Sequence, residues 1–362
     1  MADGSAVRVG VWGTGAVGQE AILGILGAPG LELVAVRVFS AGKAGLDVGS
    51  FVGTTPIGVV TTSSTSELLS ARPDVVVYAP RSPVLAEVCQ LLSAGVDVAT
   101  TAFAFHPARA AGADAEALAE ACRAGGSTLH GSGLNPGGFS GAVPFALSGL
   151  VRSLRSVTLT ERADWSVYES THITFDAMLF GRPPADVRED ASDTLAFNSD
   201  LFRQQVWLLG DALGADLDDV RTHHEVATSP EDRQVFDRVL EAGTVNAQRW
   251  RWAGVANGVE RVVIDAIWTV GPTDAPWRRA QHGWTLVLEG DPTVQAHLMT
   301  LASATEPRSL EEHVRAASAA TAMQIVNAIP AVRAAPPGFA TAADLPAPRS
   351  LQGFRSPSFG RG

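Results

Sequence analysis

The sequence predicts an α/β domain with a parallel sheet, followed by an α+β domain with a largely antiparallel sheet. The first observation is a short apolar strand over residues 7–12 that runs directly into the glycine-rich residues 13–18 and then into a helix. The second is the alternation of short apolar strands with amphipathic helices as far as residue 150. The third is a change to strands joined by tight turns after that residue. These patterns predict a Rossmann domain over residues 1–150 and a second domain over residues 151–305.

The glycine-rich stretch reads G-T-G-A-V-G, which is the spacing of a dinucleotide-binding turn. Its glycines permit a tight turn and let backbone N–H groups approach a pyrophosphate closely. The helix that follows directs the positive end of its dipole at the same place. We therefore expect the cofactor to be bound by Gly13, Thr14, Gly15, Ala16, Val17 and Gly18.

The end of the second strand, over residues 31–39, bears on the choice of cofactor. In this fold an acidic residue at that place binds the ribose hydroxyls of NAD. This chain instead has Arg37, Ser40 and Lys43, the only lysine in the sequence. Two cations and a hydroxyl favour a 2′-phosphate, so we expect NADP(H) to be preferred over NAD(H). The alternative is that both cations are solvated surface charges.

Later strand ends supply further candidate contacts, because the carboxyl ends of parallel strands line the cofactor crevice. Strands over residues 74–78 and 96–101 are followed or ended by Pro80, Arg81, Thr100 and Thr101. After the strand over residues 127–130 comes G-S-G-L-N-P-G-G, whose Asn135 carries both a donor and an acceptor suited to a carboxamide. A capping or turn role for Asn135 is the alternative.

The composition limits the function classes. A net charge of −11 argues against nucleic acid as a partner. No apolar run is long enough to cross a bilayer and the first residues do not resemble a signal peptide, so we expect a cytoplasmic protein without membrane contact. The eight histidines are scattered without ligand spacing, so we expect no metal. Lys43 follows the second strand, a poor place for Schiff-base catalysis.

The second domain is predicted from its hairpins. A strand over residues 156–164 is followed by an aromatic-rich segment and a helix over about residues 199–213. Runs over residues 249–256 and 259–270 meet at Asn257-Gly258, and a second hairpin turns at residues 290–292. One face of such a sheet must be covered, so we expect two copies to pair these faces in a homodimer.

The C-terminal part is predicted to return to the first domain. Ser309 and Glu312 form a capping-box pattern that opens a helix, which we assign within residues 306–335. Residues 336–362 are rich in proline and glycine and are expected to form an extended strap or a disordered tail.

The chain resembles the dihydrodipicolinate reductase-like group that contains the NAD(P)H-dependent amine dehydrogenases and 2,4-diaminopentanoate dehydrogenase. The resemblance rests on residues 13–18, L-E-L-V at 31–34, V-A-T-T at 98–101 and G-S-G-L-N-P-G at 131–137. G-T-V at 243–245, E-G-D-P at 289–292 and N-A-I-P-A at 327–331 are similar to an actinobacterial branch of this group. This family resemblance implies a Rossmann fold and an activity that transfers a hydride to or from a carbon bonded to nitrogen.

Two departures from the family pattern narrow the chemistry that the resemblance implies. Dihydrodipicolinate reductases carry a paired histidine followed by a lysine, whereas His223-His224 is followed by Glu225-Val226-Ala227. Adjacent strand residues point to opposite faces, so at most one of these histidines faces a ligand. Amine dehydrogenases resemble one another in a glutamate after the T-T strand end, thought to activate ammonia, where residues 102–106 read A-F-A-F-H.

Without that glutamate, the sequence favours reduction of a preformed imine or iminium, which needs no proton donor at the hydride step. Substrate contacts are expected from Phe103, Phe105, Tyr168 and Phe175. Candidate catalytic residues are Tyr168, Asn135 and His172, with Glu161 and Asp164 as further possible donors. The alternatives are an amine dehydrogenase, a carbonyl reductase, or an inactive dinucleotide-binding sensor.

Overall fold

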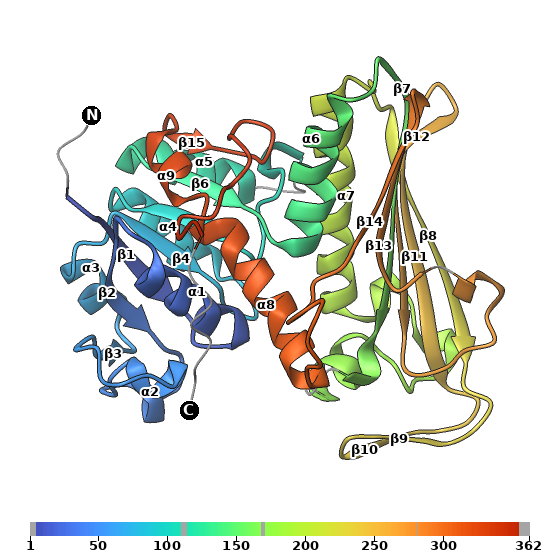
Figure 1. The fold of residues 1–362 in the computed structure, drawn as a ribbon, viewed down its shortest axis with the longest axis horizontal. Helices are drawn as coiled ribbons and strands as arrows, with labels where there is room; N and C mark the ends of the chain where they lie inside the picture. Colours follow the sequence, from blue (N-terminus) through green and yellow to red (C-terminus); the bar gives the residue numbers. More distant parts are fainter. Residues whose placement is uncertain (1–4, 110–113, 168–170, 280, 355–362) are drawn as a thin grey trace. The chain divides into compact units, whose positions relative to one another are not determined.

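The computed structural model describes residues 5–109, 114–167, 171–279 and 281–354, and it divides into two compact units. The first unit contains Met1–Gly138 and Ser318–Gly362, and the second contains Phe139–Ala317. Each unit has its own sheet and its own hydrophobic core (Figure 1). Within the described residues, no helix is both long and apolar enough to cross a membrane.

The first unit is built on a parallel sheet, which confirms the predicted Rossmann class. In its described part the strand order is β15-β6-β5-β4-β1-β2-β3, and every pairing is parallel. Its strands are β1 Val7–Trp12, β2 Leu31–Arg37, β3 Thr61–Thr62, β4 Val75–Tyr78, β5 Asp97–Thr100, β6 Thr128–Gly131 and β15 Gly338–Phe339. The order reverses between β1 and β4, and such a switch point is where this fold binds ligands.

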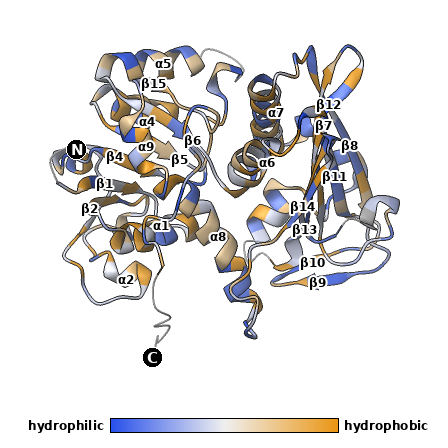
Figure 2. Cartoon of the chain, turned by 45° about the horizontal axis from the view of Figure 1, so that its top comes forward, coloured by the Kyte–Doolittle hydropathy of each residue, from blue (hydrophilic) through white to orange (hydrophobic). Residues whose placement is uncertain are grey.

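Apolar side chains cover both faces of this sheet because its strands are apolar on both sides. Val75, Val76 and Val77 of β4 are fully buried, and Figure 2 colours such residues hydrophobic. One face packs against α1, α2, α8 and α9, and the other against α3, α4 and α5. These helices are α1 Ala16–Gly27, α2 Gly49–Val52, α3 Thr65–Ser70, α4 Leu85–Ser93, α5 Asp114–Gly125, α8 Leu310–Val326 and α9 Ile329–Ala334.

The helix α8 begins in the second unit, and the chain from Ser318 onward belongs to the first unit. At the start of α8, Ser309 N donates to Glu312 Oε2 at 2.7 Å and Glu312 N donates to Ser309 Oγ at 3.2 Å, which is the predicted capping box. The last turns of α8 pack on α1, and β15 then adds a strand beside β6. Arg333 of α9 donates to buried Asp97 at 2.6 Å.

The second unit has a mixed, largely antiparallel sheet. In the described residues its order is β14-β13-β7-β12-β11-β8, and only the pairing of β12 with β7 is parallel. Its strands are β7 Ser153–Asp164, β8 Asp219–Thr228, β11 Val245–Ala256, β12 Val259–Thr269, β13 Gly283–Asp291 and β14 Val294–Leu298. The predicted turn at Asn257-Gly258 joins β11 to β12. A separate hairpin is formed by β9 Arg233–Val235 and β10 Arg238–Leu240.

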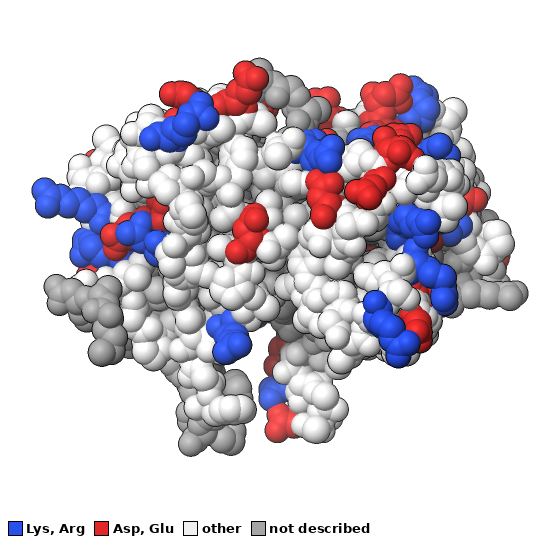
Figure 3. Space-filling model, turned by 90° about the horizontal axis from the view of Figure 1, so that it is seen from above, with Lys and Arg blue, Asp and Glu red and all other residues white. Residues whose placement is uncertain are grey.

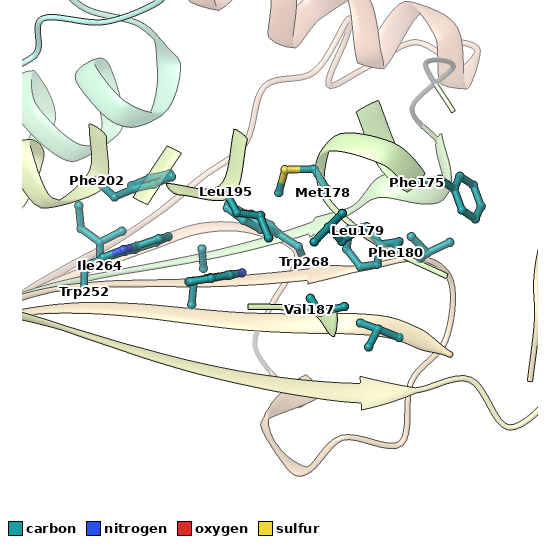
Figure 4. Close-up of a cluster of buried hydrophobic side chains, with 14 of the residues drawn as sticks. Phe175, Met178, Leu179, Phe180, Val187, Leu195, Phe202, Trp252, Ile264 and Trp268 are labelled. Atoms are coloured by element: carbon teal, nitrogen blue, oxygen red, sulfur yellow. The ribbon is translucent and has the colours of Figure 1, made fainter. Parts of the chain in front are cut away.

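An aromatic core lies between one face of this sheet and the helices α6 Val143–Ser148 and α7 Asp193–Leu213. Figure 4 shows Phe202 of α7 against Trp252, with Trp268 beside them. The ring centroids of Phe202 and Trp252 are 4.3 Å apart and nearly parallel. On the face of the molecule in Figure 3, acidic and basic side chains are interspersed.

Candidate dinucleotide site

The turn between β1 and α1 uses its three glycines for three different reasons. A Cβ on Gly13, whose φ is +105°, would lie 2.9 Å from the carbonyl oxygen of Ala79. A Cβ on Gly18 would collide with the carbonyl oxygen of Gly13, so this glycine lets the helix approach the turn. A Cβ on Gly15 would meet no atom within 4 Å. Space is therefore left at the middle glycine, where a pyrophosphate approaches in this fold.

The N-terminus of α1 suits an anion. Gly15 is its N-cap, the first turn contains no acidic residue, and no side chain caps it. Its first N–H groups are therefore available to a ligand. Ala16 is exposed beside Gly15, whereas Thr14 is buried and Val17 packs into the core. The residues present fit a dinucleotide pyrophosphate held mainly by backbone N–H groups.

Arg37, at the end of β2, is turned inward. Its guanidinium carbon lies 4.0 Å from the centroid of the Trp12 ring and 5.1 Å from that of Phe39. Its Nη2 donates to Glu87 Oε1 at 3.1 Å, and the side chain is only 13% exposed. Its Nε and Nη1 are buried without an acceptor among the described residues. Arg37 is therefore not a solvated surface charge.

Glu87 is a residue that the sequence analysis missed. The sequence has no acidic residue at the end of β2, but the structure brings a carboxylate to Arg37 from elsewhere: the first turn of α4 carries Glu87 there from fifty residues further along the chain. Tyr78 Oη lies 3.3 Å from Glu87 Oε2 and accepts from Val84 N at 2.9 Å. Burial above all, with Glu87 adding to it, raises the pKa of Tyr78 to about 12. In the sequence, the only signal for Glu87 is its position within α4, and that position does not reveal which residue it contacts.

Ser40 and Lys43 remain exposed beyond β2. Ser40 precedes the helical turn Ala41–Lys43, and the Nζ of Lys43 lies 5.9 Å from the Phe51 ring centroid. Of the predicted residues after β4, Pro80 is half-buried and Arg81 is exposed. These side chains remain available at the carboxyl edge of the sheet.

The ends of β5 and β6 are joined by backbone contacts. Thr100 is fully buried; its Oγ1 accepts from Ala102 N at 3.0 Å and its carbonyl accepts from Ser132 N at 2.9 Å. Thr101 is half-buried beside it. Thr100 therefore shapes the turn after β5.

The loop over residues 131–138 is tightly packed, so its glycines serve the chain itself. A Cβ on Gly131 would collide with the carbonyl oxygens of Phe103 and Ala104. A Cβ on Gly138 would lie 2.9 Å from the amide carbon of Gln324 in α8. Gly138 N donates to Gly133 O at 2.7 Å and closes the loop, which holds Asn135 half-buried. Gln324 is a second residue that the sequence analysis missed.

Phe103 and Phe105 do not alternate along a strand. β5 ends at Thr100, and Ala104 has a φ of +64°, which turns the chain. The Phe103 ring meets the Tyr78 ring edge-on with centroids 6.3 Å apart, and Phe105 is 2% exposed. Both phenylalanines therefore pack within the first unit, and this turn carries no carboxylate.

In the second unit, Phe175 is buried in the aromatic core, and Figure 4 shows it at the edge of that cluster. His172 is exposed, and its Nδ1 lies 2.9 Å from Asp176 Oδ2. Arg238 of β10 donates to both oxygens of Asp176, at 2.7 and 2.8 Å. The hydrogen bonds from Arg238 and then His172 lower the pKa of Asp176 to about 2. Tyr168 lies outside the described residues.

His223 and His224 point to opposite faces of β8, as expected for neighbours on a strand. The His223 side chain is exposed, whereas the His224 ring stacks on Trp250 with centroids 3.7 Å apart. Burial lowers the pKa of His224 to about 4, so this ring is neutral at pH 7. Among the described residues, no three His, Cys, Asp or Glu side chains are grouped to hold a metal ion.

Comparison with known proteins agrees with this geometry. The chain is 29% identical to an amine dehydrogenase of Streptomyces virginiae over 358 residues, which cover 93% of this chain and 95% of that protein. The structure of the amine dehydrogenase from Mycobacterium smegmatis is similar with a TM-score of 0.75 and 21% identity, over 97% of this chain and 99% of that one. The biliverdin reductase of Synechocystis, solved with biliverdin and NADP+, matches with a TM-score of 0.50 and 17% identity, over 87% and 96% of the two chains.

A family model also matches directly. Residues 145–358 match the 2,4-diaminopentanoate dehydrogenase C-terminal domain. This confirms the resemblance that the motifs indicated, and it supports an oxidoreductase with an NAD(P)-binding fold. The chain belongs to the family defined by the 2,4-diaminopentanoate dehydrogenase C-terminal domain.

Proposed function

We propose that this protein reduces a preformed C=N bond of a small organic substrate, using NAD(P)H as the hydride donor. The observation that carries the proposal is the turn after β5, where residues 101–106 contain no carboxylate and its phenylalanines pack inward. Ammonia addition to a carbonyl needs a base, and carbonyl reduction needs a proton donor. An iminium needs neither at the hydride step.

The chemistry balances without a side-chain acid. When bound, the dihydronicotinamide would supply a hydride: a C–H bond of its ring breaks, the ring is oxidised to a pyridinium, and the hydride forms the new C–H bond at the iminium carbon, which is reduced. The C=N π electrons become the nitrogen lone pair, so the cation becomes a neutral amine. What the chain contributes is the glycine turn that holds the pyrophosphate and the packed loops that fix the cofactor and exclude water.

The test compares two kinds of substrate. A cyclic imine with NADPH, without ammonia, is expected to be reduced faster than the corresponding ketone supplied with ammonia. Ala102→Glu is expected to raise amination, because Ala102 is half-buried in the turn and its replacement leaves the Phe103–Tyr78 contact in place. Efficient amination by the native protein, with no reduction of preformed imines, would contradict the proposal.

One observation favours a second candidate, amine dehydrogenase or carbonyl reductase chemistry. The Asp176 carboxylate, held by Arg238, fixes the Nδ1 of exposed His172 and leaves its Nε2 to exchange protons. In His172→Gln, the rate of imine reduction is expected to stay within about twofold of the native rate. If the second candidate is right, amination or carbonyl reduction falls roughly 10²-fold in this variant. A protein that binds NADPH and consumes it with neither substrate would be a sensor.

We also propose a preference for NADP(H), supported by Ser40 and Lys43, and by two N–H groups of Arg37 that have no acceptor among the described residues. Because Lys43 is the only lysine, pyridoxal phosphate followed by borohydride modifies one side chain and the N-terminal amine. NADPH is expected to protect Lys43 at concentrations roughly tenfold below those of NADH. Equal protection by both would contradict the preference. In Lys43→Arg, which keeps the positive charge, any pyridoxal label that remains is on the N-terminal amine.

A further inference from the structure

Gln324 lies in the last turns of α8, against the loop that follows β6. A Cβ on Gly138 would lie 2.9 Å from Gln324 Cδ and 3.1 Å from both its Nε2 and its Oε1. The loop backbone is therefore pressed against the flat side of this amide. Thr321, one turn earlier on α8, borders the same loop at Gly133. The side chain is held in place by packing at the carboxyl edge of the sheet.

The amide oxygen is held there without a donor. Gln324 Oε1 is buried and accepts no hydrogen bond from any described residue. A buried acceptor without a partner costs free energy, and native proteins satisfy most such groups. Methionine or leucine would fill the same space without that cost. The retained oxygen points to a hydrogen bond made with a ligand.

The position within the sheet indicates which ligand. The pyrophosphate turn follows β1, and the cations predicted for the adenosine end follow β2 on one side of it. The other end of a dinucleotide then extends past β4 and β5 toward β6, on the opposite side. The nicotinamide carboxamide is the part of that end that carries N–H donors. A protonated amine of the substrate offers the same donor chemistry.

We propose that Gln324 Oε1 accepts a hydrogen bond from the carboxamide N–H of the nicotinamide. This rests on the proposed dinucleotide function. It makes Gln324 a cofactor-binding residue that fixes the orientation of the pyridine ring, while Asn135 of the adjoining loop is the sequence-predicted carboxamide contact. Gln324 comes from a helix nearly two hundred residues later in the chain than β6.

The experiment measures binding rather than turnover. Dissociation constants of NADP+ and of its 3-acetylpyridine analogue, in which a methyl replaces the carboxamide NH2, are measured by calorimetry without substrate. The native protein is expected to bind NADP+ roughly five- to tenfold more tightly than the analogue. In Gln324→Met the two constants become equal, and in Gln324→Glu, which keeps an acceptor, the preference returns. Gln90→Leu, an exposed glutamine of α4, is the control and keeps the native preference.

A thermal measurement separates this role from a structural one. Without dinucleotide, Gln324→Met is expected to melt at or above the native temperature, because it removes an unsatisfied buried acceptor. A lower melting temperature together with an unchanged preference for NADP+ overturns the inference. The inference is also overturned if Gln324→Met binds both dinucleotides as the native protein does but has a raised KM for the amine or imine. If the native protein binds no dinucleotide at all, the proposed function fails and this inference fails with it.

Discussion

At the scale of the residue, Gly15 and Gly18 are both glycines for opposite reasons. Space surrounds Gly15, whose backbone angles suit any residue, whereas Gly18 is pressed against Gly13 O. We expect Gly15→Ala to fold like the native protein and to bind NADP+ at least tenfold more weakly, because its methyl group occupies the path of the pyrophosphate. Gly18→Ala is expected to lose about 1–3 kcal/mol of unfolding free energy through overpacking.

Calorimetric titration and chemical denaturation distinguish these two outcomes. Gly149→Ala is a matched control, because a Cβ there meets only ordinary contact at 3.5 Å and belongs to the second unit. Native-like NADP+ affinity in Gly15→Ala would show that no pyrophosphate passes this glycine.

His224 makes stability depend on pH. Burial holds its folded-state pKa near 4, below the unfolded value of about 6.5. The unfolded chain therefore binds an additional proton between these values, so the stabilising contribution is complete above pH 6.5 and is lost as the pH falls toward 4. His224→Phe keeps the stack on Trp250 and is expected to reduce the slope of melting temperature against pH in this window.

Buried His130 also makes the melting temperature rise with pH, as His224 does, because burial lowers the pKa of His130 too. His130→Phe alone, measured in parallel, separates the two histidines. An unchanged slope in His224→Phe would mean that folding does not lower the pKa of His224. His282→Gln, at an exposed histidine outside β8, serves as the surface control.

At the scale of the element, Arg333 links α9 to the parallel sheet through a close ion pair with Asp97 and a longer one, of 3.7 Å, with Asp74. Arg333 Nη1 lies 2.6 Å from Asp97 Oδ2, and Asp97 also accepts from Thr128 N at 2.7 Å on the neighbouring strand. Burial raises the pKa of Asp97, and the hydrogen bond from Arg333 opposes this. Arg333→Met leaves the buried carboxylate with less compensation and is expected to cost about 2 kcal/mol.

A double-mutant cycle tests this tie. Asp97→Asn in the Arg333→Met background is expected to restore part of the lost stability, because a neutral amide replaces the unpaired carboxylate. Additive losses measured by denaturant unfolding would show that the two residues act independently. Arg155→Met, which removes an exposed ion pair with Glu289, provides a surface comparison.

At the scale of the whole molecule, we expect a homodimer that uses the face of the β7–β14 sheet turned away from α7. Trp250 and Trp252 point toward α7, so the alternating Arg249 and Arg251 point to the other face. There Arg249 donates to both Asp265 and Glu225, so this face carries a network of paired charges. Ile267 on that face is only 3% exposed.

Sedimentation equilibrium at micromolar concentration measures the mass. A dimer is expected for the native protein, and Arg249→Ala is expected to raise its dissociation constant at least tenfold. Arg203→Ala is the control, because it removes an ion pair with Glu189 at α7 instead. A monomeric native protein would contradict the expectation.

The sequence by itself determined the features that depend on neighbours in the chain. Alternating valines, the G-x-G-x-x-G spacing and Asn257-Gly258 act over a few residues, so they predicted the parallel sheet, the glycine turn between β1 and α1 and the β11–β12 hairpin. The opposite orientation of His223 and His224 followed from strand geometry in the same way.

Only the tertiary structure decided which side chains meet across long separations. It brought Glu87 to Arg37 and turned that arginine onto Trp12, and it laid Gln324 on Gly138. The alternation of Phe103 with Phe105 gave no strand, because Ala104 turns the chain where Gly131 crosses it. Such contacts depend on how helices pack on a sheet, and packing is set by the shapes of all partners together, which no local pattern records.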